Sequence, residues 1–354
     1  MSRVLILALA AFAITYGTTP LVRKFAVRIG ALDRPNSRKV HRSLMPYLGG
    51  IAIYLGFIAV VLAAIPLSKS ILGLILGSTI ILILGVVDDL KELSPKVKLL
   101  GQIAAALLVI PFGIRVDILT NPFNGVLHLG VFSIPVTVFW IIAVTNAVNL
   151  IDGLDGLAAG VAGVAASTLA VVAWTLGQTT VVYLAVILAA STFAFLRYNF
   201  HPARIFMGDG GAMFLGFALA SLSVMGFTKG ATLISLLVPV VILGIPILDT
   251  LFAIVRRYAN HRPILQADRD HLHHRLLALG LTHRQTVLVI YSLSIILGGS
   301  AVLLTRLTTA QGVLILIFLS TSIIVAAERV GVIGKKAWSR REFQQVHRST
   351  TKLH

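Results

Sequence analysis

Long apolar runs recur from one end of this chain to the other, and they constrain its fold more than any other feature. Each run has about 17 to 25 residues, and short polar or basic segments separate one run from the next. A helix of about 20 residues crosses a hydrocarbon layer about 30 Å thick. Only helices and closed barrels satisfy every backbone polar group in lipid, and the residue alternation of membrane strands is absent. The sequence therefore predicts an all-α, polytopic integral membrane protein.

The composition narrows the class further. Only 12% of the 354 residues are charged, against about 25% in an average soluble protein, which excludes a soluble globular domain. Without cysteine, neither a disulfide nor a thiolate metal site is part of the structure. The net charge of +17 is typical of basic loops that face anionic lipid in a membrane protein this hydrophobic, so no nucleic-acid partner is expected.

About eleven membrane spans are expected from the apolar runs. The first run, Val4 to Thr19, lacks a small-residue cleavage site and is interpreted as a membrane helix rather than a signal peptide. The predicted spans lie near residues 3–20, 47–65, 71–87, 97–112, 132–147, 157–176, 180–196, 211–227, 231–255, 286–304 and 311–327.

Basic segments predict the orientation of these spans. Clusters of Arg and Lys follow the first span ("RKFAVRIGALDRPNSRKVHR"), the ninth span ("RRYANHRPILQADRDHLHHR") and the last span ("KKAWSRREFQQVHR"). Because positive loops stay in the cytoplasm, we expect the N-terminus outside and the C-terminus inside, which requires an odd number of spans. The predicted organisation is a transmembrane domain over residues 1–328, with its active site at the cytoplasmic face of the plasma (inner) membrane, and a basic cytoplasmic tail over 329–354.

Acidic residues are distributed unevenly between the two predicted faces. The chain has 13 of them, and almost all lie on or near the cytoplasmic side, whereas Asp117 is the exception in the outer loops. Acidic residues contribute little to membrane orientation. Their asymmetry therefore indicates a functional site at the cytoplasmic edge.

Two adjacent carboxylates, Asp88 and Asp89, stand at the inner end of the third span, with Lys98 shortly after them. Adjacent carboxylates repel each other unless a cation lies between them and a ligand, and nearby lysines suit a phosphate-bearing partner. The alternative is a helix-end cap followed by a solvated basic loop. The pair decides little by itself.

The segment "NAVNLIDGLDGL" places Asn146, Asn149, Asp152 and Asp155 three residues apart. Residues three apart on a helical turn share a face, so these side chains are expected to point together toward one ligand. Interleaved glycines permit a tight backbone or a close ligand approach. A polar turn between two spans is the alternative.

Asp209 lies between glycines at the start of the eighth span, in "FMGDGGAMFLG". A carboxylate there suits a hard cation, with the free amides of the helix N-terminus facing a phosphate. A simple N-cap is the competing interpretation.

The segment "DRDHLHHRLLALG" supplies His271, His273, His274 and Arg275. Nearby carboxylates favour Mg²⁺ or Mn²⁺ with a phosphorylated substrate over zinc. The His and Arg side chains are expected to bind pyrophosphate oxygens, and a solvated loop is the alternative.

Asp249, inside the ninth span and near Pro246, is a secondary candidate because carboxylates within membrane spans are commonly functional. Here the alternative is a cap at a helix break or a partner for a basic loop. Together, the four motifs supply carboxylates, amides, histidines and cations on one predicted face, which is the inventory for metal-assisted phosphoryl or phosphosugar transfer.

These motifs resemble a known family. In this order and at these separations, "GVVDDLKEL", "NAVNLIDGLDGL", "FMGDGGAMFLG" and "DRDHLHHRLLALG" are similar to those of the polyprenyl-phosphate N-acetylhexosamine-1-phosphate transferases. The resemblance runs from about residue 30 to about residue 285. It implies a membrane enzyme that moves a sugar 1-phosphate from a UDP-sugar to a polyprenyl phosphate with Mg²⁺, Mn²⁺ being the alternative ion, and releases UMP.

The resemblance also implies roles for single residues. Asp88 and Asp89 match a pair of which one is proposed to deprotonate the lipid phosphate, and Asn149 and Asp209 match positions associated with the metal. Catalytic residues are thus expected at Asp88, Asp89 and Asp209. The expected substrate-binding residues are Asp152 and Asp155 near the uracil nucleotide, Asn146 on the same stripe, Lys98, and the loop residues His271, His273, His274 and Arg275.

The branch of the family follows from smaller details. Phospho-MurNAc-pentapeptide translocases carry three consecutive histidines and a "TPTMGG" segment, whereas this chain has "HLHH" and "LMPYLGG". The chain looks more like the branch that uses UDP-N-acetylglucosamine and undecaprenyl phosphate to begin teichoic acid, O-antigen or similar surface glycans. The translocase is the alternative, and a transporter is the alternative from another class, disfavoured because the charges cluster at one membrane edge rather than the midplane. The oligomeric state stays open, with a homodimer as one alternative.

Overall fold

The computed structural model describes residues 2–33, 44–120, 126–227, 233–259 and 271–329, and most of them are helical. Two short antiparallel hairpins interrupt the helices, β1 with β2 and β3 with β4. The elements in chain order are α1 (Ser2–Arg28), β1 (Leu32–Asp33), β2 (Met45–Pro46), α2 (Gly50–Ala64), α3 (Lys69–Lys91), α4 (Pro95–Val109), η1 (Ile110–Phe112), β3 (Ile118–Thr120), β4 (Val126–His128), η2 (Gly130–Phe132), α5 (Ser133–Leu150), α6 (Leu157–Thr175), α7 (Thr179–Asn199), α8 (Gly208–Phe227), α9 (Leu233–Ile242), α10 (Gly244–Ala259), α11 (Leu272–Ala278), α12 (His283–Leu304) and α13 (Thr309–Arg329).

Within the described residues, nine helices are long and apolar enough to cross a membrane, and α2 is a shorter apolar helix. The prediction of an all-helical, multi-pass membrane protein is therefore confirmed, while the count of eleven spans stays a prediction. The expected ninth span, 231–255, is divided into α9 and α10. Its break falls at Leu243, which follows Pro239 by one helical turn and precedes Pro246. The tail, apart from Arg329, lies outside the described residues.

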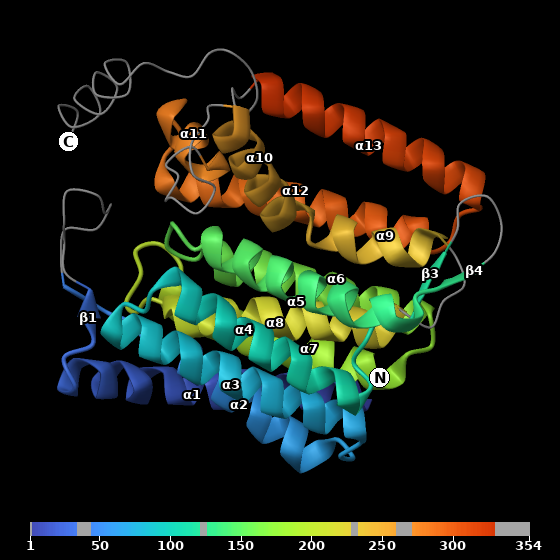
Figure 1. Cartoon of the computed structure of the whole chain (residues 1–354). Coiled ribbons are helices and arrows are strands. Elements are labelled where there is room, and N and C mark those ends of the chain that lie inside the picture. Colours follow the sequence, from blue (N-terminus) through green and yellow to red (C-terminus); the bar gives the residue numbers. More distant parts are fainter. Residues whose placement is uncertain (1, 34–43, 121–125, 228–232, 260–270, 330–354) are drawn as a thin grey trace.

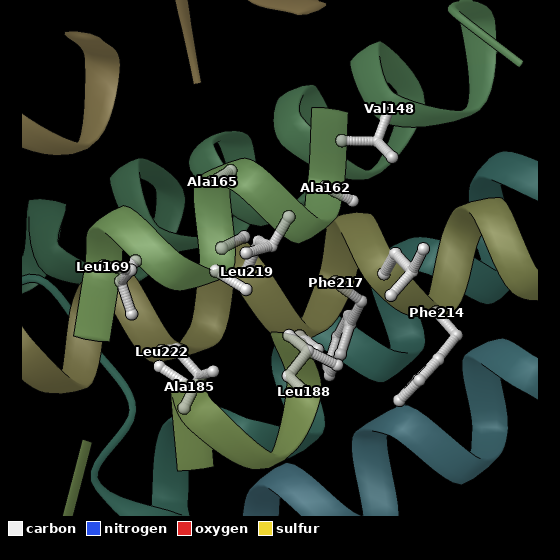
Figure 2. Packing of buried hydrophobic residues seen from close by; sticks show 14 of the residues in the cluster. Val148, Ala162, Ala165, Leu169, Ala185, Leu188, Phe214, Phe217, Leu219 and Leu222 are labelled. Atoms are coloured by element: carbon white, nitrogen blue, oxygen red, sulfur yellow. The ribbon is translucent and has the colours of Figure 1, made fainter. Parts of the chain in front are cut away.

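Helix α8 is the centre of the bundle. In its most apolar stretch of 18 residues, 83% of the residues are buried, whereas only 11% are buried in the corresponding stretch of α13 at the periphery. Side chains of α8 meet those of α5, α6 and α7 in a core that Figure 2 shows from close by. The labelled residues of this core are Val148 of α5, Ala162, Ala165 and Leu169 of α6, Ala185 and Leu188 of α7, and Phe214, Phe217, Leu219 and Leu222 of α8. Small residues on α6 allow the helices to approach closely, which is how membrane helices gain packing contacts in lipid.

Glycines fix the position of the first turn of α8. The backbone of Gly210 lies so close to Gly85 of α3 that a Cβ at either residue would meet the opposing helix, and Gly50 of α2 packs in the same way on Gly211. Only glycine permits this backbone-to-backbone approach. As a result, the N-terminus of α8 lies directly against the C-terminal part of α3.

The polar motifs gather at one end of the bundle. The C-terminal ends of α3 and α5 meet the N-terminal ends of α4 and α8 there through side-chain contacts. In Figure 1 this end also carries β1 and α11, whereas β3 and β4 lie at the opposite end. The clustering that the sequence predicts on one face is therefore present in the fold.

Candidate active site

An acidic centre lies where α3, α4, α5 and α8 meet, and we define it as Asp88, Asp89, Lys98, Asn149 and Asp209. The Nζ atom of Lys98 is 2.6 Å from Oδ2 of Asp88 and 2.6 Å from Oδ2 of Asp209. The side chain of Asp88 is 9% exposed, whereas that of Asp209 is 41% exposed. Asp209 is therefore the more solvent-accessible of these two carboxylates.

Asn149 completes the ring around Lys98. With its amide oriented to suit both neighbours, its oxygen accepts from Lys98 Nζ at 3.3 Å and its nitrogen donates to Oδ1 of Asp209 at 3.2 Å. The last turn of α5 thus brings Asn149 to the first turn of α8, as the resemblance implies for two residues associated with one metal.

The donor atoms of this ring fit a hard divalent cation. In the structure the ammonium group of Lys98 is surrounded by oxygens of Asp88, Asn149 and Asp209, and it stands in for the positive charge that these oxygens attract. Carboxylate and amide oxygens are the ligands that Mg²⁺ and Mn²⁺ prefer. Asp209 and Asn149, assisted by Asp88, are therefore a chemically suitable magnesium set.

Asp89 has a different environment from its neighbour Asp88. Its Oδ1 accepts from the backbone N–H of Asp209 at 2.8 Å and its Oδ2 accepts from that of Gly210 at 3.2 Å. These amides belong to the first turn of α8, so Asp89 caps that helix from α3. The expectation that the free amides of α8 face a phosphate is wrong for these two, because Asp89 occupies them.

Asn146 is held by Gln102, a residue outside the four sequence motifs. Its amide nitrogen donates to Oε1 of Gln102 at 2.7 Å, and the amide nitrogen of Gln102 donates back to Oδ1 of Asn146 at 3.2 Å. Gln102 is 2% exposed, and its amide nitrogen also donates to Sδ of Met213 at 3.3 Å. This reciprocal pair joins α4 to α5 one helical turn before Asn149 on α5.

Asp152 and Asp155 do not continue the helical face of Asn146 and Asn149. Helix α5 ends at Leu150, and residues 151–156 form a turn. Its last residue, Gly156, has a φ of 78° and is the N-cap of α6. The shared helical face predicted for all four residues is therefore wrong beyond Asn149. Desolvation, followed by the charges of Asp209, Asp89 and Asp155, raises the pKa of Asp152 to about 8.

The histidine loop forms a second cluster, which we call the histidine brace and define as Asp249, His271 and His273. Oδ2 of Asp249 lies 2.8 Å from Nδ1 of His271, and Oδ1 accepts from the backbone N–H of Leu272 at 2.8 Å. Asp249 on α10 thereby caps α11 and fixes the ring of His271. Asp249 is thus a partner of the loop, which is one of the two alternatives predicted for it.

The histidine brace contacts the turn between α5 and α6. A Cβ at Gly153 would come within 2.5 Å of Nε2 of His273, so the ring packs directly against the backbone beside Asp152. Burial, and then the neighbouring His274, lower the pKa of His273 to about 3, so its ring is neutral at pH 7. His274 lies 4.2 Å from His273 between ring centroids, and Arg275 is buried. The structure thus joins the histidine loop to the turn that carries Asp152.

Several polar residues near the site had no strong sequence signal. Asn199 at the end of α7 accepts from Gly156 N–H at 3.1 Å and donates to Ile205 C=O at 3.0 Å. Tyr291 of α12 donates to the carbonyl of Gly156. Gln102 and Asn199 are amides at the ends of otherwise apolar runs, and buried polar groups in such runs need partners. That rule is the signal that would have identified them.

Comparison with known proteins adds a further line of observation. The model of the family described as glycosyl transferase family 4 matches residues 71–227, a range that includes every member of the acidic centre. The chain is 43% identical over 320 residues to the "probable undecaprenyl-phosphate N-acetylglucosaminyl 1-phosphate transferase" of Bacillus subtilis, covering 90% of this chain and 89% of that protein. It is 35% identical to the decaprenyl-phosphate N-acetylglucosaminephosphotransferase of Mycolicibacterium smegmatis, over 81% of this chain and 78% of the relative. With the undecaprenyl-phosphate alpha-N-acetylglucosaminyl 1-phosphate transferase of Escherichia coli O157:H7 the identity is 28%, over 91% and 88% of the two chains.

Proposed function

Because this chain belongs to glycosyl transferase family 4, and within it to the polyprenyl-phosphate N-acetylglucosaminyl 1-phosphate transferases, we propose that it takes its sugar phosphate from UDP-N-acetylglucosamine. The acceptor is undecaprenyl phosphate, and the second product is UMP. The observation that carries the proposal is the acidic centre, where Asp88, Asn149 and Asp209 gather oxygens around one positive charge.

We propose that the acidic centre faces the cytoplasm from the inner membrane. The basic segments that follow the first and ninth predicted spans support this orientation, because positive loops stay on the cytoplasmic side. A UDP-sugar is a cytoplasmic metabolite, whereas a polyprenyl phosphate resides in the bilayer with its phosphate at the surface. A site at one end of a helix bundle is therefore accessible to both substrates.

The chemical difficulty of the reaction is the approach of two anions. An oxygen of the lipid phosphate attacks the β-phosphorus of the UDP-sugar, and the bond to the α-phosphate oxygen breaks. Mg²⁺ bound by Asp209 and Asn149 would supply a Lewis acid that screens this repulsion. Lys98, released from its contacts with Asp88 and Asp209, supplies a mobile positive charge at the same place.

The two adjacent aspartates have different roles in this mechanism. Asp88 contacts Lys98 and so lies within the reacting region, whereas Asp89 holds the first turn of α8 and acts as a positioning residue. A phosphomonoester has a second pKa of about 6 and is mostly dianionic at pH 7, so positioning matters more than proton removal. Direct displacement and a two-step route through a phosphosugar-enzyme intermediate are both consistent with this division.

A reconstituted assay tests the proposal. Purified protein receives undecaprenyl phosphate, Mg²⁺ and one of several labelled donors: UDP-N-acetylglucosamine, UDP-N-acetylgalactosamine, UDP-glucose or UDP-MurNAc-pentapeptide. We expect lipid-linked product and UMP from UDP-N-acetylglucosamine, both dependent on the lipid and abolished by a chelator.

Two outcomes would contradict the proposal. Product from UDP-MurNAc-pentapeptide alone would instead support the translocase of peptidoglycan synthesis. Uptake of intact UDP-sugar into vesicles without release of UMP would support a transporter. A matched reaction with the lipid omitted separates transfer from hydrolysis of the donor.

A further inference from the structure

A second group of metal-ligating side chains lies outside the acidic centre and consists of Asp155, His201 and His283. Asp155 belongs to the turn before α6, His201 follows α7, and His283 is the first residue of α12. One ligand atom from each of the three lies within 4.8 Å of the other two. The cluster therefore joins three segments that are distant in sequence.

The distances between the ligand atoms of the cluster are close to those around a bound cation. Nδ1 of His201 is 2.8 Å from Oδ2 of Asp155, and the rings of His201 and His283 are stacked with centroids 4.1 Å apart. Ligands of a tetrahedral zinc ion, with bonds near 2.0 Å, lie about 3.3 Å from each other. The side chain of His201 is 37% exposed and has room to adjust. Small rotations therefore convert the cluster into a coordination site.

One nitrogen of the cluster lacks a partner. Nε2 of His283 is buried and makes no hydrogen bond to any of the residues that the structure describes. Buried polar atoms are nearly always satisfied, so an orphaned ring nitrogen indicates a missing ligand. A cation bound by this nitrogen would satisfy it.

Neighbouring contacts hold the three segments in place. Oδ2 of Asp155 also accepts from the backbone N–H of Ala203 at 3.1 Å, and Arg284 donates to the carbonyl of His201 at 3.3 Å. Through Gly156, the turn is tied to Asn199 and Tyr291 as described above. The cluster is therefore preorganised, which lowers the entropic cost of binding.

We propose that Asp155, His201 and His283 form a transition-metal site for a cation of the Zn²⁺ class, separate from the magnesium set. Two imidazoles and one carboxylate suit Zn²⁺, Co²⁺ or Ni²⁺, whereas Mg²⁺ prefers oxygen ligands alone. Water supplies the fourth ligand. The bound cation cross-links the turn between α5 and α6 to the start of α12 and stabilises the edge of the bundle next to Asp152.

Metal titration tests this proposal without reference to transferase activity. Tag-free protein in detergent, with excess Mg²⁺ to occupy oxygen-only sites, is titrated with Zn²⁺ by calorimetry and with Co²⁺ by visible absorption. We expect a single Zn²⁺ site, a Co²⁺ band typical of tetrahedral coordination, and a raised melting temperature. His201→Gln and His283→Gln each weaken binding by roughly tenfold or more.

Matched variants decide where the cation binds. His128→Gln, on β4 at the opposite end of the bundle, retains the wild-type affinity. Melting curves without metal confirm that His201→Gln and His283→Gln are folded, and the two variants test the site independently. The proposal is overturned if the wild-type protein binds no Zn²⁺, if both variants bind it as tightly as the wild type, or if His274→Gln alone abolishes binding.

Discussion

The acidic centre and the histidine brace both pair a carboxylate with a nitrogen base, yet they differ in how their partners are assigned. In the acidic centre, one ammonium group is shared by Asp88, Asn149 and Asp209, and Asp209 is 41% exposed. In the histidine brace, each oxygen of Asp249 has its own partner, and the side chains of His271 and Asp249 are only 6% and 3% exposed. The shared contacts of the acidic centre can exchange one partner for another, whereas the dedicated contacts of the brace stay paired.

This difference predicts separate consequences of mutation. A shared, partly exposed ion pair contributes little to stability, because water and the remaining partners replace a lost contact. A buried carboxylate with dedicated partners leaves unsatisfied groups when it is removed. Mutation of Asp209, the exposed member of the shared contacts, should therefore affect chemistry alone, whereas mutations in the brace should affect stability first.

The largest expected effect is that of Asp209→Asn on transferase activity. The variant loses the exposed charge of the acidic centre, which we propose as a metal ligand, so we expect activity with Mg²⁺ to fall about 10³-fold. The free energy of unfolding should change by less than about 1 kcal/mol, because Lys98 retains Asp88. Initial rates and Mn²⁺ affinity on purified protein measure the first effect, and melting curves measure the second. Activity near that of the wild type would show that Asp209 does not bind the metal.

The reverse pattern is expected for Asp249→Ala. Removal of this carboxylate leaves Nδ1 of His271 and the N–H of Leu272 without their buried acceptor. We expect the free energy of unfolding to fall by about 3 kcal/mol, measured in detergent by denaturant or heat. The matched control is Asp117→Ala, whose half-exposed carboxylate contacts Arg115 and the Ser133 hydroxyl, and it should cost less than about 1 kcal/mol.

Asp249→Asn sharpens this second prediction. The amide oxygen still accepts one of the two hydrogen bonds, so this variant should lie between the wild type and Asp249→Ala in stability. If Asp249→Ala melts with the wild type while activity alone is lost, the brace is not the permanent structure that its geometry indicates, and Asp249 belongs with the chemistry.

A third test displaces the first turn of α8 without replacing any side chain of the acidic centre. In Gly85→Ala the new Cβ meets the backbone of Gly210, which cannot move aside as a flexible side chain would. We expect a loss of about 2 kcal/mol in the free energy of unfolding, from overpacking, and roughly tenfold lower activity, from displacement of the first turn of α8. Gly299→Ala on α12 is the control, since a Cβ there has no atom within 4 Å. Equal behaviour of the two variants would disprove the close approach of α3 and α8.

The sequence predicted the acidic centre better than the brace, for a physical reason. Helices that cross a membrane must place their polar ends at one surface, so Asp88, Asn149 and Asp209 were grouped correctly from spans and charges alone. The apolar runs also placed one helix at each predicted span except the ninth, which is divided into α9 and α10. They do not reveal which polar ends touch, because that depends on how the helices pack around α8.

Two other features depend on helix packing in the same way, and the sequence did not predict them. The spacing of three residues predicted one helical face through Asp155, but the helix ends at Leu150, and spacing cannot show where a helix stops. The pairing of Asp249 with His271 joins residues 22 positions apart across a segment that includes residues outside the described ranges. Proline correctly indicated a break in this span, and only the structure shows that His273 of α11 packs against Gly153.

The smallest expected effect is the contribution that His273 of the brace makes to the pH dependence of stability. The pKa of His273 is about 3 in the folded protein, chiefly because burial disfavours the charged ring, against about 6.5 in an unfolded chain. The unfolded state therefore binds more protons between these values, and stability is complete above pH 6.5 and falls as the pH drops below it. From pH 7 to pH 5.5, His273 alone contributes a loss of about 1 kcal/mol.

His273→Gln isolates this contribution. The variant should lose the part of the pH slope that His273 causes, so its difference in stability from the wild type shrinks by about 1 kcal/mol between pH 7 and pH 5.5. His128→Gln, at the other end of the bundle, should keep the wild-type slope. An unchanged slope in His273→Gln would mean that the ring takes up a proton in the folded protein. The brace would then respond to pH as readily as an exposed site, and its contrast with the acidic centre would disappear.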